Sequence, residues 1–243
     1  MSPRPRGIIL AAGRGMRMGA LTEEVPKCLL VAGGRRLLDW QLGSMRAAGI
    51  LEIAIVTGYK AELLANEGTE QFHNDMWNSS DMVSSLKYAS EWLENGPCIV
   101  SYSDIYYNPS AIAGLLSSTA DLAVTYDPDW LHLWKRRFAD PLSDAESFRL
   151  QRDGYLAEIG RKVDSVELIE GQYMGLTKFS AAGWATFADT VNMFPTASSA
   201  TLQMTAVLQR IVELNFIPIE AVAYTGAWGE IDSASDLDLL GAG

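Results

Sequence analysis

Cysteine and histidine are scarce in this sequence, and each shortage excludes a class of chemistry. The chain has two cysteines among 243 residues, Cys28 and Cys98, which lie far apart and lack the spacing of metal ligands. This usage is typical of a cytoplasmic protein with reduced thiols. The two histidines, His73 and His132, have no context that resembles a catalytic triad.

Long apolar runs and an excess of basic residues are also missing. No apolar run approaches the ~20 residues that a membrane-spanning helix needs. The apolar segment after the basic start MSPRPR is too short for the core of a signal peptide. A net charge of −11 argues against a nucleic-acid partner. We therefore expect a cytoplasmic protein that binds neither membranes nor nucleic acid, and a homodimer stays open.

Short β-branched segments alternate with helical patterns through the first half of the chain. This alternation predicts βαβ units and an α/β fold, with a Rossmann-like, mostly parallel sheet and helices on both faces. At 48% hydrophobic residues, the chain can bury the core of a single domain over residues 1–243. The predicted strands are 7–12, 52–59, 97–104, 120–127 and 215–224, and the predicted helices are 37–49, 81–96, 181–193, 201–214 and 233–242.

The rhythm changes at about residues 127–175, which are rich in Trp, Arg and Asp. Within this segment, residues 148–160 have the pattern of a small β-hairpin that turns at Asp153-Gly154. An insertion of this kind in an α/β domain usually carries substrate contacts. We therefore expect an acceptor-binding insertion rather than a separate core.

The first predicted strand runs into a Gly/Arg-rich loop, in the stretch GIILAAGRGMRMGALTEEVPKCLL at residues 7–30. Glycines let such a loop present backbone N–H groups to an anion. The loop lacks the GK[ST] of a P-loop and the third glycine of the dinucleotide fingerprint. Pro26 then fixes the approach of Lys27, which can return to the same phosphates as a point charge. We expect Arg17 and Lys27 to lie in a solvated loop.

These residues resemble the signature of nucleotidyltransferases that activate phosphorylated compounds, L-A-A-G-x-G-x-R-(M/L) followed by P-K-x-L. The resemblance implies the nucleotide-diphospho-sugar transferase type of fold, with Arg17 and Lys27 as the catalytic cations that neutralise the triphosphate. The nucleotide-binding residues that it implies are Leu10, Ala11, Ala12, Gly13, Arg14, Gly15, Met16, Arg17, Lys27 and Ser85.

Two acidic motifs extend the resemblance along the chain. SYSDIYY carries Asp104 where the family has a metal-binding aspartate, and GEIDSASDL resembles the late E-(I/V)-D-x-x-x-D-L motif, whose first aspartate is Asp232. The resemblance implies that these two residues hold Mg²⁺, or Mn²⁺ in its place. Glu230 is a candidate for orienting a metal-bound water.

A narrower likeness is to cytidylyltransferases that act on small phosphorylated alcohols and phosphonates, such as the phosphocholine enzymes. Asp81 stands where their N-M-V-x-S-L segment has Asn, and Gln203 stands where they have Asp. The likeness implies Mg²⁺-dependent transfer of CMP from CTP to phosphocholine, an aminoethylphosphonate or a hydroxyalkylphosphonate, with release of pyrophosphate. An acceptor that is already anionic needs no general base.

The identity of the acceptor stays open. Aromatic residues with Glu170 would suit an ammonium, whereas Arg136 and Arg137 would suit a carboxylate. The candidate acceptor residues are Lys162, Glu170, Tyr173, Arg137 and Glu230. Two other functions also stay open: a sugar-1-phosphate nucleotidyltransferase that uses UTP, GTP or dTTP, and a catalytically inactive, nucleotide-binding regulatory subunit.

Overall fold

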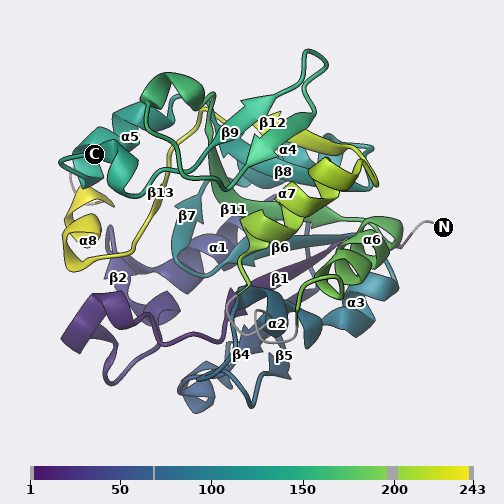
Figure 1. Cartoon of the computed structure of the whole chain (residues 1–243). Coiled ribbons are helices and arrows are strands. Elements are labelled where there is room, and N and C mark those ends of the chain that lie inside the picture. The colour runs from purple at the N-terminus through teal and green to yellow at the C-terminus, as the bar shows by residue number, and fades with distance from the viewer. Residues whose placement is uncertain (1–2, 68, 196–201, 241–243) are drawn as a thin grey trace.

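A seven-stranded sheet forms the centre of the protein in the computed structural model, which describes residues 3–67, 69–195 and 202–240 (Figure 1). One strand, β11, runs antiparallel to both of its neighbours, and the other pairings are parallel. The prediction of a mostly parallel α/β sheet is therefore confirmed. The strand order is β12 (Ile219–Ala223), β8 (Leu122–Asp127), β11 (Gln172–Phe179), β6 (Cys98–Tyr102), β1 (Arg6–Ala11), β4 (Ile53–Thr57) and β5 (Glu70–His73).

Helices cover both faces of this sheet (Figure 1). One group consists of α1 (Leu37–Ala47) and α4 (Pro109–Ser117), which pack against each other. In the other group, α6 (Ala181–Val191) packs against both α3 (Ser90–Glu94) and α7 (Met204–Leu214). Because both faces are covered, β1, β4 and β6 are buried along nearly their whole length rather than on alternate residues.

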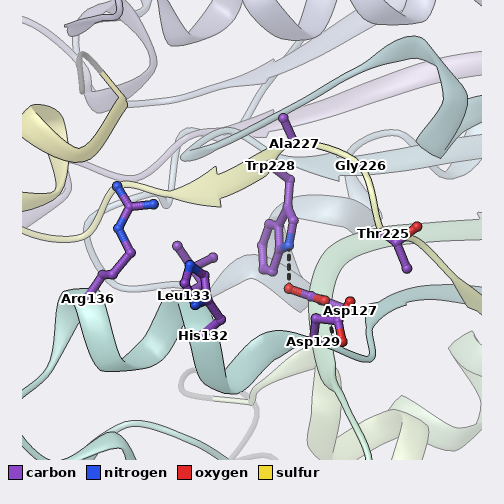
Figure 2. Close-up of a pocket in the computed structure, with 9 residues that line it drawn as sticks. All are labelled: Asp127, Asp129, His132, Leu133, Arg136, Thr225, Gly226, Ala227 and Trp228. Atoms are coloured by element: carbon purple, nitrogen blue, oxygen red, sulfur yellow. Dashed lines mark hydrogen bonds between the residues drawn. The ribbon is translucent and has the colours of Figure 1, made fainter. Parts of the chain in front are cut away.

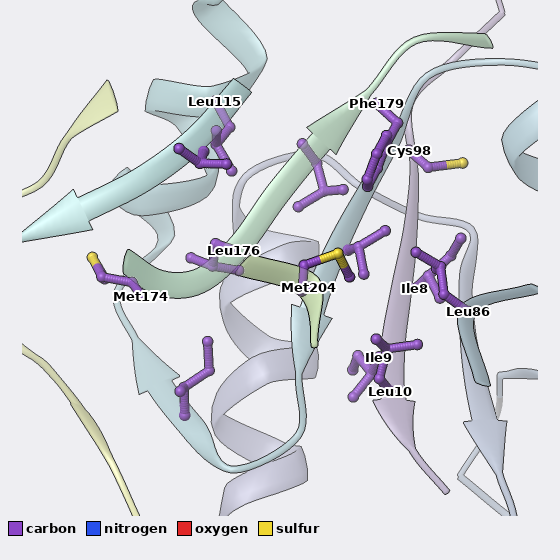
Figure 3. Packing of buried hydrophobic residues seen from close by; sticks show 14 of the residues in the cluster. Ile8, Ile9, Leu10, Leu86, Cys98, Leu115, Met174, Leu176, Phe179 and Met204 are labelled. Atoms are coloured by element: carbon purple, nitrogen blue, oxygen red, sulfur yellow. The ribbon is translucent and has the colours of Figure 1, made fainter. Parts of the chain in front are cut away.

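The core lies between the sheet and these helices (Figure 3). Ile8 and Ile9 of β1 are fully buried, and Phe179 of β11 and Leu115 of α4 are buried in the same cluster. Burying a side chain of this size contributes roughly 1.5–3 kcal/mol. The strand that leads into the Gly-rich loop is thus anchored at the centre of the core.

The predicted helix at 81–96 is wrong as a single helix. The structure has α2 (Met82–Lys87) and α3 with a turn between them. The Ser90 hydroxyl donates to the Lys87 carbonyl oxygen, and the amide of Ala89 bonds the carbonyl three residues earlier. Serine side chains compete with the helical hydrogen-bond pattern in this way.

The segment at 127–175 contains a helix, α5 (Trp130–Arg137), that the sequence did not predict. The predicted hairpin is present as β9 (Phe148–Leu150) and β10 (Leu156–Ile159), with Gly154 at φ 86°. The segment ends inside β11, which also went unpredicted and enters the sheet between β8 and β6. Whether this segment binds the acceptor stays a prediction.

A small two-stranded sheet joins distant parts of the chain. It pairs β7 (Ile105–Tyr107) with β13 (Trp228–Glu230), and α8 (Ala234–Leu240) follows. Residues 201, 241 and 242 of the predicted helices lie outside the described residues. Within the described part of the chain, no helix combines the length and apolar character needed to cross a membrane.

The strand order creates a topological switch point beside β1. The chain leaves β1 for β4 on one side, and after β5 it returns to β6 on the other side. Open α/β sheets bind ligands at such a point, outside the carboxyl ends of the strands. The Gly-rich loop follows β1 and Asp104 follows β6, so both predicted motifs lie at this edge.

We predict that neither thiol of the native protein reacts with a thiol reagent at neutral pH. Cys28 and Cys98 are buried, and burial raises the pKa of each thiol to about 12. An absorbance assay with an aromatic disulfide should give no fast phase until denaturant is added, and then two thiols per chain. Fast reaction in native buffer would show that the packing around β6 or residues 27–29 opens readily.

Candidate active site

The Gly-rich loop turns sharply just after β1. Gly15 has a left-handed backbone, with φ 74°, and a Cβ there would lie 3.0 Å from side-chain carbons of Lys27. Glycine therefore lets the loop lie directly against Lys27. Arg17 lies in the 3₁₀ helix that follows, Met16–Thr22, rather than in a loop; its side chain is 70% exposed, as expected, but it also donates to Asp232 Oδ1 at 2.7 Å.

Lys27 differs from that expectation, because only 7% of its surface is exposed. It opens a short 3₁₀ turn after Pro26, and its Nζ donates to Asp104 Oδ2 at 2.8 Å and to Asp232 Oδ1 at 2.9 Å. A buried ammonium is stable only when it is paired in this way. The prediction of a solvated Lys27 is therefore wrong, and the physical reason is its double ion pair.

Asp104 and Asp232 are brought together by the pairing of β7 with β13. Asp104 lies in the turn before β7, and its carbonyl oxygen accepts from the amide of Ile231 at 2.9 Å. Asp236 fixes the turn after β13, since its Oδ2 accepts from the amides of Asp232 and Ser233. The two acidic motifs thus form one structural unit.

Three carboxylates meet at this point. One oxygen from each of Asp104, Glu230 and Asp232 lies within 4.8 Å of the other two. Asp104 Oδ1 is buried and has no hydrogen-bond partner among the described residues. An all-oxygen set with an unpaired buried carboxylate oxygen fits Mg²⁺ or Mn²⁺. The geometry adds Glu230, predicted only to orient a water, as a third candidate ligand.

Arg137 is paired with Glu230 and Asp232 of this cluster and also with Asp236. Its side chain is 1% exposed and donates to Glu230, Asp232 and Asp236 at 3.0–3.2 Å. The prediction of Arg137 as an acceptor ligand needs a free guanidinium. Glu230, Asp232 and Asp236 all engage it, so the guanidinium is not free, and a role of Arg137 in acceptor binding stays a prediction.

The charges in the cluster shift the pKa values of its members. Burial opposes the charged form of Lys27, but Asp104 and Asp232 raise the Lys27 pKa above its ordinary value. Burial also opposes ionisation of Asp232, yet Lys27 and Arg17 hold its pKa below the usual range. Burial and the two neighbouring aspartates raise the pKa of Glu230 to about 8. The cluster is therefore an interdependent set of charges.

A cavity of about 230 Å³ lies beside the start of the Gly-rich loop. It brings together Leu10, Ala12, Gly13 and Ser85, all predicted to bind the nucleotide. Asn74 fixes Ser85 by donating to its hydroxyl at 2.9 Å. Ala11 is buried at the end of β1, Arg14 lies over the Tyr59 ring at 5.8 Å, and Met16 is 78% exposed.

A second cavity, of about 430 Å³, is lined on one side by Glu230 and Asp232 of the acidic cluster. Of the predicted acceptor residues, Lys162, Tyr173 and Glu230 line it. Glu170 is not among its lining residues, and its carboxylate accepts from the amide of Leu150 at 2.6 Å. The structure therefore does not bring Glu170 to this cavity, and its carboxylate is bonded instead to β9 of the hairpin.

A third hollow, of about 440 Å³, lies on the other side of α5 (Figure 2). It contains Arg136 and His132, with Asp127 bonded to the indole Nε1 of Trp228 at 2.8 Å. Arg136 is thus separate from the acidic cluster, and it does not line the second cavity.

Sequence reasoning overlooked several residues of the second cavity. Asp144 and Glu146 line it together with Trp134, and Asp236 supports the cluster beneath it. The Ser233-x-x-Asp236 spacing at the start of α8 has the form of a capping box and could have identified Asp236. Asp144 and Glu146 carried no signal, because only the fold of the insertion turns them inward.

We predict that Arg137→Met lowers the free energy of unfolding by about 3–5 kcal/mol, because it leaves buried carboxylates without their cation. Urea denaturation measures this change. Arg136→Met is the matched control, because Arg136 immediately precedes Arg137 on the same helix but is exposed. Its replacement should lower the free energy of unfolding by less than about 0.5 kcal/mol. Equal midpoints for the two variants would contradict this stabilising role of Arg137.

The sequence matches known proteins along its length. The model of the MobA-like NTP transferase domain matches residues 7–162. The CTP:phosphoglutamine cytidylyltransferase of Campylobacter jejuni is 33% identical over 248 residues, covering 96% of this chain and 97% of that protein.

Solved structures share the fold. A putative glucose-1-phosphate thymidylyltransferase from Bacillus anthracis has a TM-score of 0.77 and 15% identity, over 98% of this chain and 94% of that one. The CTP:phosphocholine cytidylyltransferase of Streptococcus pneumoniae has a TM-score of 0.69 and 21% identity, over 98% of both chains. These likenesses confirm the nucleotide-diphospho-sugar transferase type of fold. The chain therefore belongs to the family of the MobA-like NTP transferase domain and is a nucleotidyltransferase.

Proposed function

We propose that the protein is a cytidylyltransferase that transfers CMP from CTP to a small phosphorylated acceptor and releases pyrophosphate. The observation that carries this proposal is the meeting of Lys27 and Arg17 with the three carboxylates beside the Gly-rich loop. Cations for a triphosphate and oxygen ligands for a divalent ion are the two needs of phosphoryl transfer. The Campylobacter jejuni relative, which this chain matches over 97% of that protein's length, is named for cytidylyl transfer, and this supports CTP as the donor.

The reaction needs alignment and charge neutralisation rather than a proton acceptor. An anionic oxygen of the acceptor attacks the α-phosphorus of CTP, and the bond from that phosphorus to the oxygen bridging to the β-phosphate breaks. Pyrophosphate leaves with the electron pair. Asp104, Asp232 and Glu230 would hold Mg²⁺, whose positive charge would lower the repulsion that the acceptor anion meets from the triphosphate. Lys27 and Arg17 bind the phosphates and orient them for in-line attack.

In the free protein these cations already have partners. Lys27 bonds Asp104 and Asp232, and Arg17 bonds Asp232 at 2.7 Å. When a triphosphate enters, it offers the two cations new anionic partners, and the carboxylate oxygens become free as metal ligands. Arg137 does not change partners when the triphosphate enters, because its side chain is buried and stays paired with Glu230 and Asp232.

The charges of the second cavity favour a zwitterionic acceptor. Asp144, Glu146 and Trp134 line the cavity, a set that suits an ammonium group, and Lys162 offers one cation for a carboxylate. Arg136 and Arg137, the alternative carboxylate ligands, do not line this cavity. A phosphorylated amino acid such as phosphoglutamine carries both charges, and the relative that acts on it supports this class.

We predict that pyrophosphate release with CTP is fastest with phosphoglutamine in a panel that includes phosphocholine, aminoethylphosphonate, a hydroxyalkylphosphonate and sugar 1-phosphates. Glu146→Gln should raise KM about tenfold or more for acceptors with an ammonium group, because it removes a charged contact. KM for the hydroxyalkylphosphonate should not change, and this acceptor is the internal control. A preference for sugar 1-phosphates with UTP, GTP or dTTP would instead support the sugar-nucleotide alternative.

We also predict that Asp104→Asn and Asp232→Asn each lower turnover by at least about two decades while circular dichroism stays native. Both changes disable one site, so the double variant should be little worse than either single one. A chelator should abolish activity, and Mg²⁺ or Mn²⁺ should restore it. Normal turnover by Asp232→Asn at saturating Mg²⁺ would rule out the carboxylate mechanism.

A further inference from the structure

Asp81 lies on the wall shared by two cavities. It lines the smaller cavity next to the Gly-rich loop, and it also lines the larger cavity that Glu230 and Asp232 border. Among the lining residues of the smaller cavity it is the one charged side chain, since the others are apolar, glycine or serine. A nucleotide whose base enters that cavity therefore meets a carboxylate.

Only one of the two carboxylate oxygens of Asp81 has a hydrogen-bond partner among the described residues. Its Oδ1 accepts from the amide of Ser84 at 2.8 Å and caps α2. Its Oδ2 is buried and has no hydrogen-bond partner among the described residues. An unpaired buried oxygen of this kind is costly, so it points to a donor that the free protein does not supply.

The neighbouring side chains of Asn74 and Ser85 already form hydrogen bonds with other groups. The Ser85 hydroxyl donates to the carbonyl oxygen of Asp81 at 2.9 Å, and Asn74 donates to both Ser80 and Ser85. Asn74 Oδ1 in turn accepts from the amide of Met76. These bonds hold the wall in place and leave Asp81 Oδ2 as an acceptor without a donor.

We propose that Asp81 selects cytosine over uracil by accepting a hydrogen bond from the exocyclic amino group of the base. This inference rests on the proposed transfer from CTP. An ionised carboxylate only accepts hydrogen bonds, and cytosine presents N4–H₂, whereas uracil presents a carbonyl oxygen at the same place. A uracil in the same pose would put two acceptors face to face, and both would lose their water.

The simpler role for Asp81 is that of a helix cap and nothing else. Asparagine caps a helix about as well as aspartate, so Asp81→Asn keeps the bond to Ser84 and the size of the side chain. The substitution changes only the charge and the acceptor-only character, because an amide can also donate to a carbonyl. The same variant therefore separates selection of the base from capping.

The test compares kcat/KM for CTP and UTP in the wild type and in Asp81→Asn, with one acceptor. We expect the preference for CTP to fall by about one to two decades, as for the loss of one base contact, with part of the change appearing as faster use of UTP. Asp75→Asn is the control, since Asp75 lies on the same segment but is exposed and bonds the Tyr88 hydroxyl. It should leave the preference unchanged.

Calorimetric binding of CTP and UTP to the same variants gives a reading that does not depend on turnover. An unchanged CTP/UTP ratio in Asp81→Asn, in binding and in kcat/KM, overturns the inference and leaves the proposed function intact. A wild type that binds CTP selectively but turns over no acceptor would instead contradict the proposed function. In that case the binding ratio of Asp81→Asn still tests the role of Asp81.

Discussion

The ion pairs of Lys27 with Asp104 and Asp232 are the interaction on which the site depends. Two carboxylates from distant segments of an acidic protein would repel each other across a buried space. Lys27 makes their approach favourable, because its ammonium lies 2.8–2.9 Å from both. The geometry of the surrounding segments follows from this contact. Gly15 lets the loop lie on the lysine, and the pairing of β7 with β13 holds the two aspartates on either side of it.

The same charges serve the free protein and the proposed reaction in different arrangements. Arg17 and Lys27 stabilise the carboxylates until phosphates compete for them, whereas Arg137 is buried and fixed. Binding of the nucleotide and binding of the metal should therefore support each other, because the nucleotide draws away the cations that occupy the metal ligands. The two cavities share Asp81, so the base and the acceptor would bind next to each other, with the acceptor on the side of Glu230 and Asp232.

Local patterns revealed the parts of the structure that depend on local physics. Continuous apolar strands, a Gly-rich loop after the first of them, and the hairpin at Gly154 all have short-range signals. By contrast, β11 joins the sheet between β8 and β6 through long-range pairing, and Gly175 marks its irregularity close to the Tyr102 ring. The roles of Arg137 and Glu170 depended on contacts far along the chain, 95 residues from Arg137 to Asp232 and 20 from Glu170 to Leu150. No spacing in the sequence encodes such contacts.

The most direct test of this account is a crystal structure of the protein with Mn²⁺ and a non-hydrolysable CTP analogue, read through the anomalous signal of the metal. The account predicts a manganese peak between Asp104 and Asp232, at the oxygen distances of a coordinated ion. It also predicts that Lys27 Nζ has left Asp104 and contacts the phosphates. A complex in which Lys27 still bridges both aspartates, with the metal bound elsewhere, would contradict it.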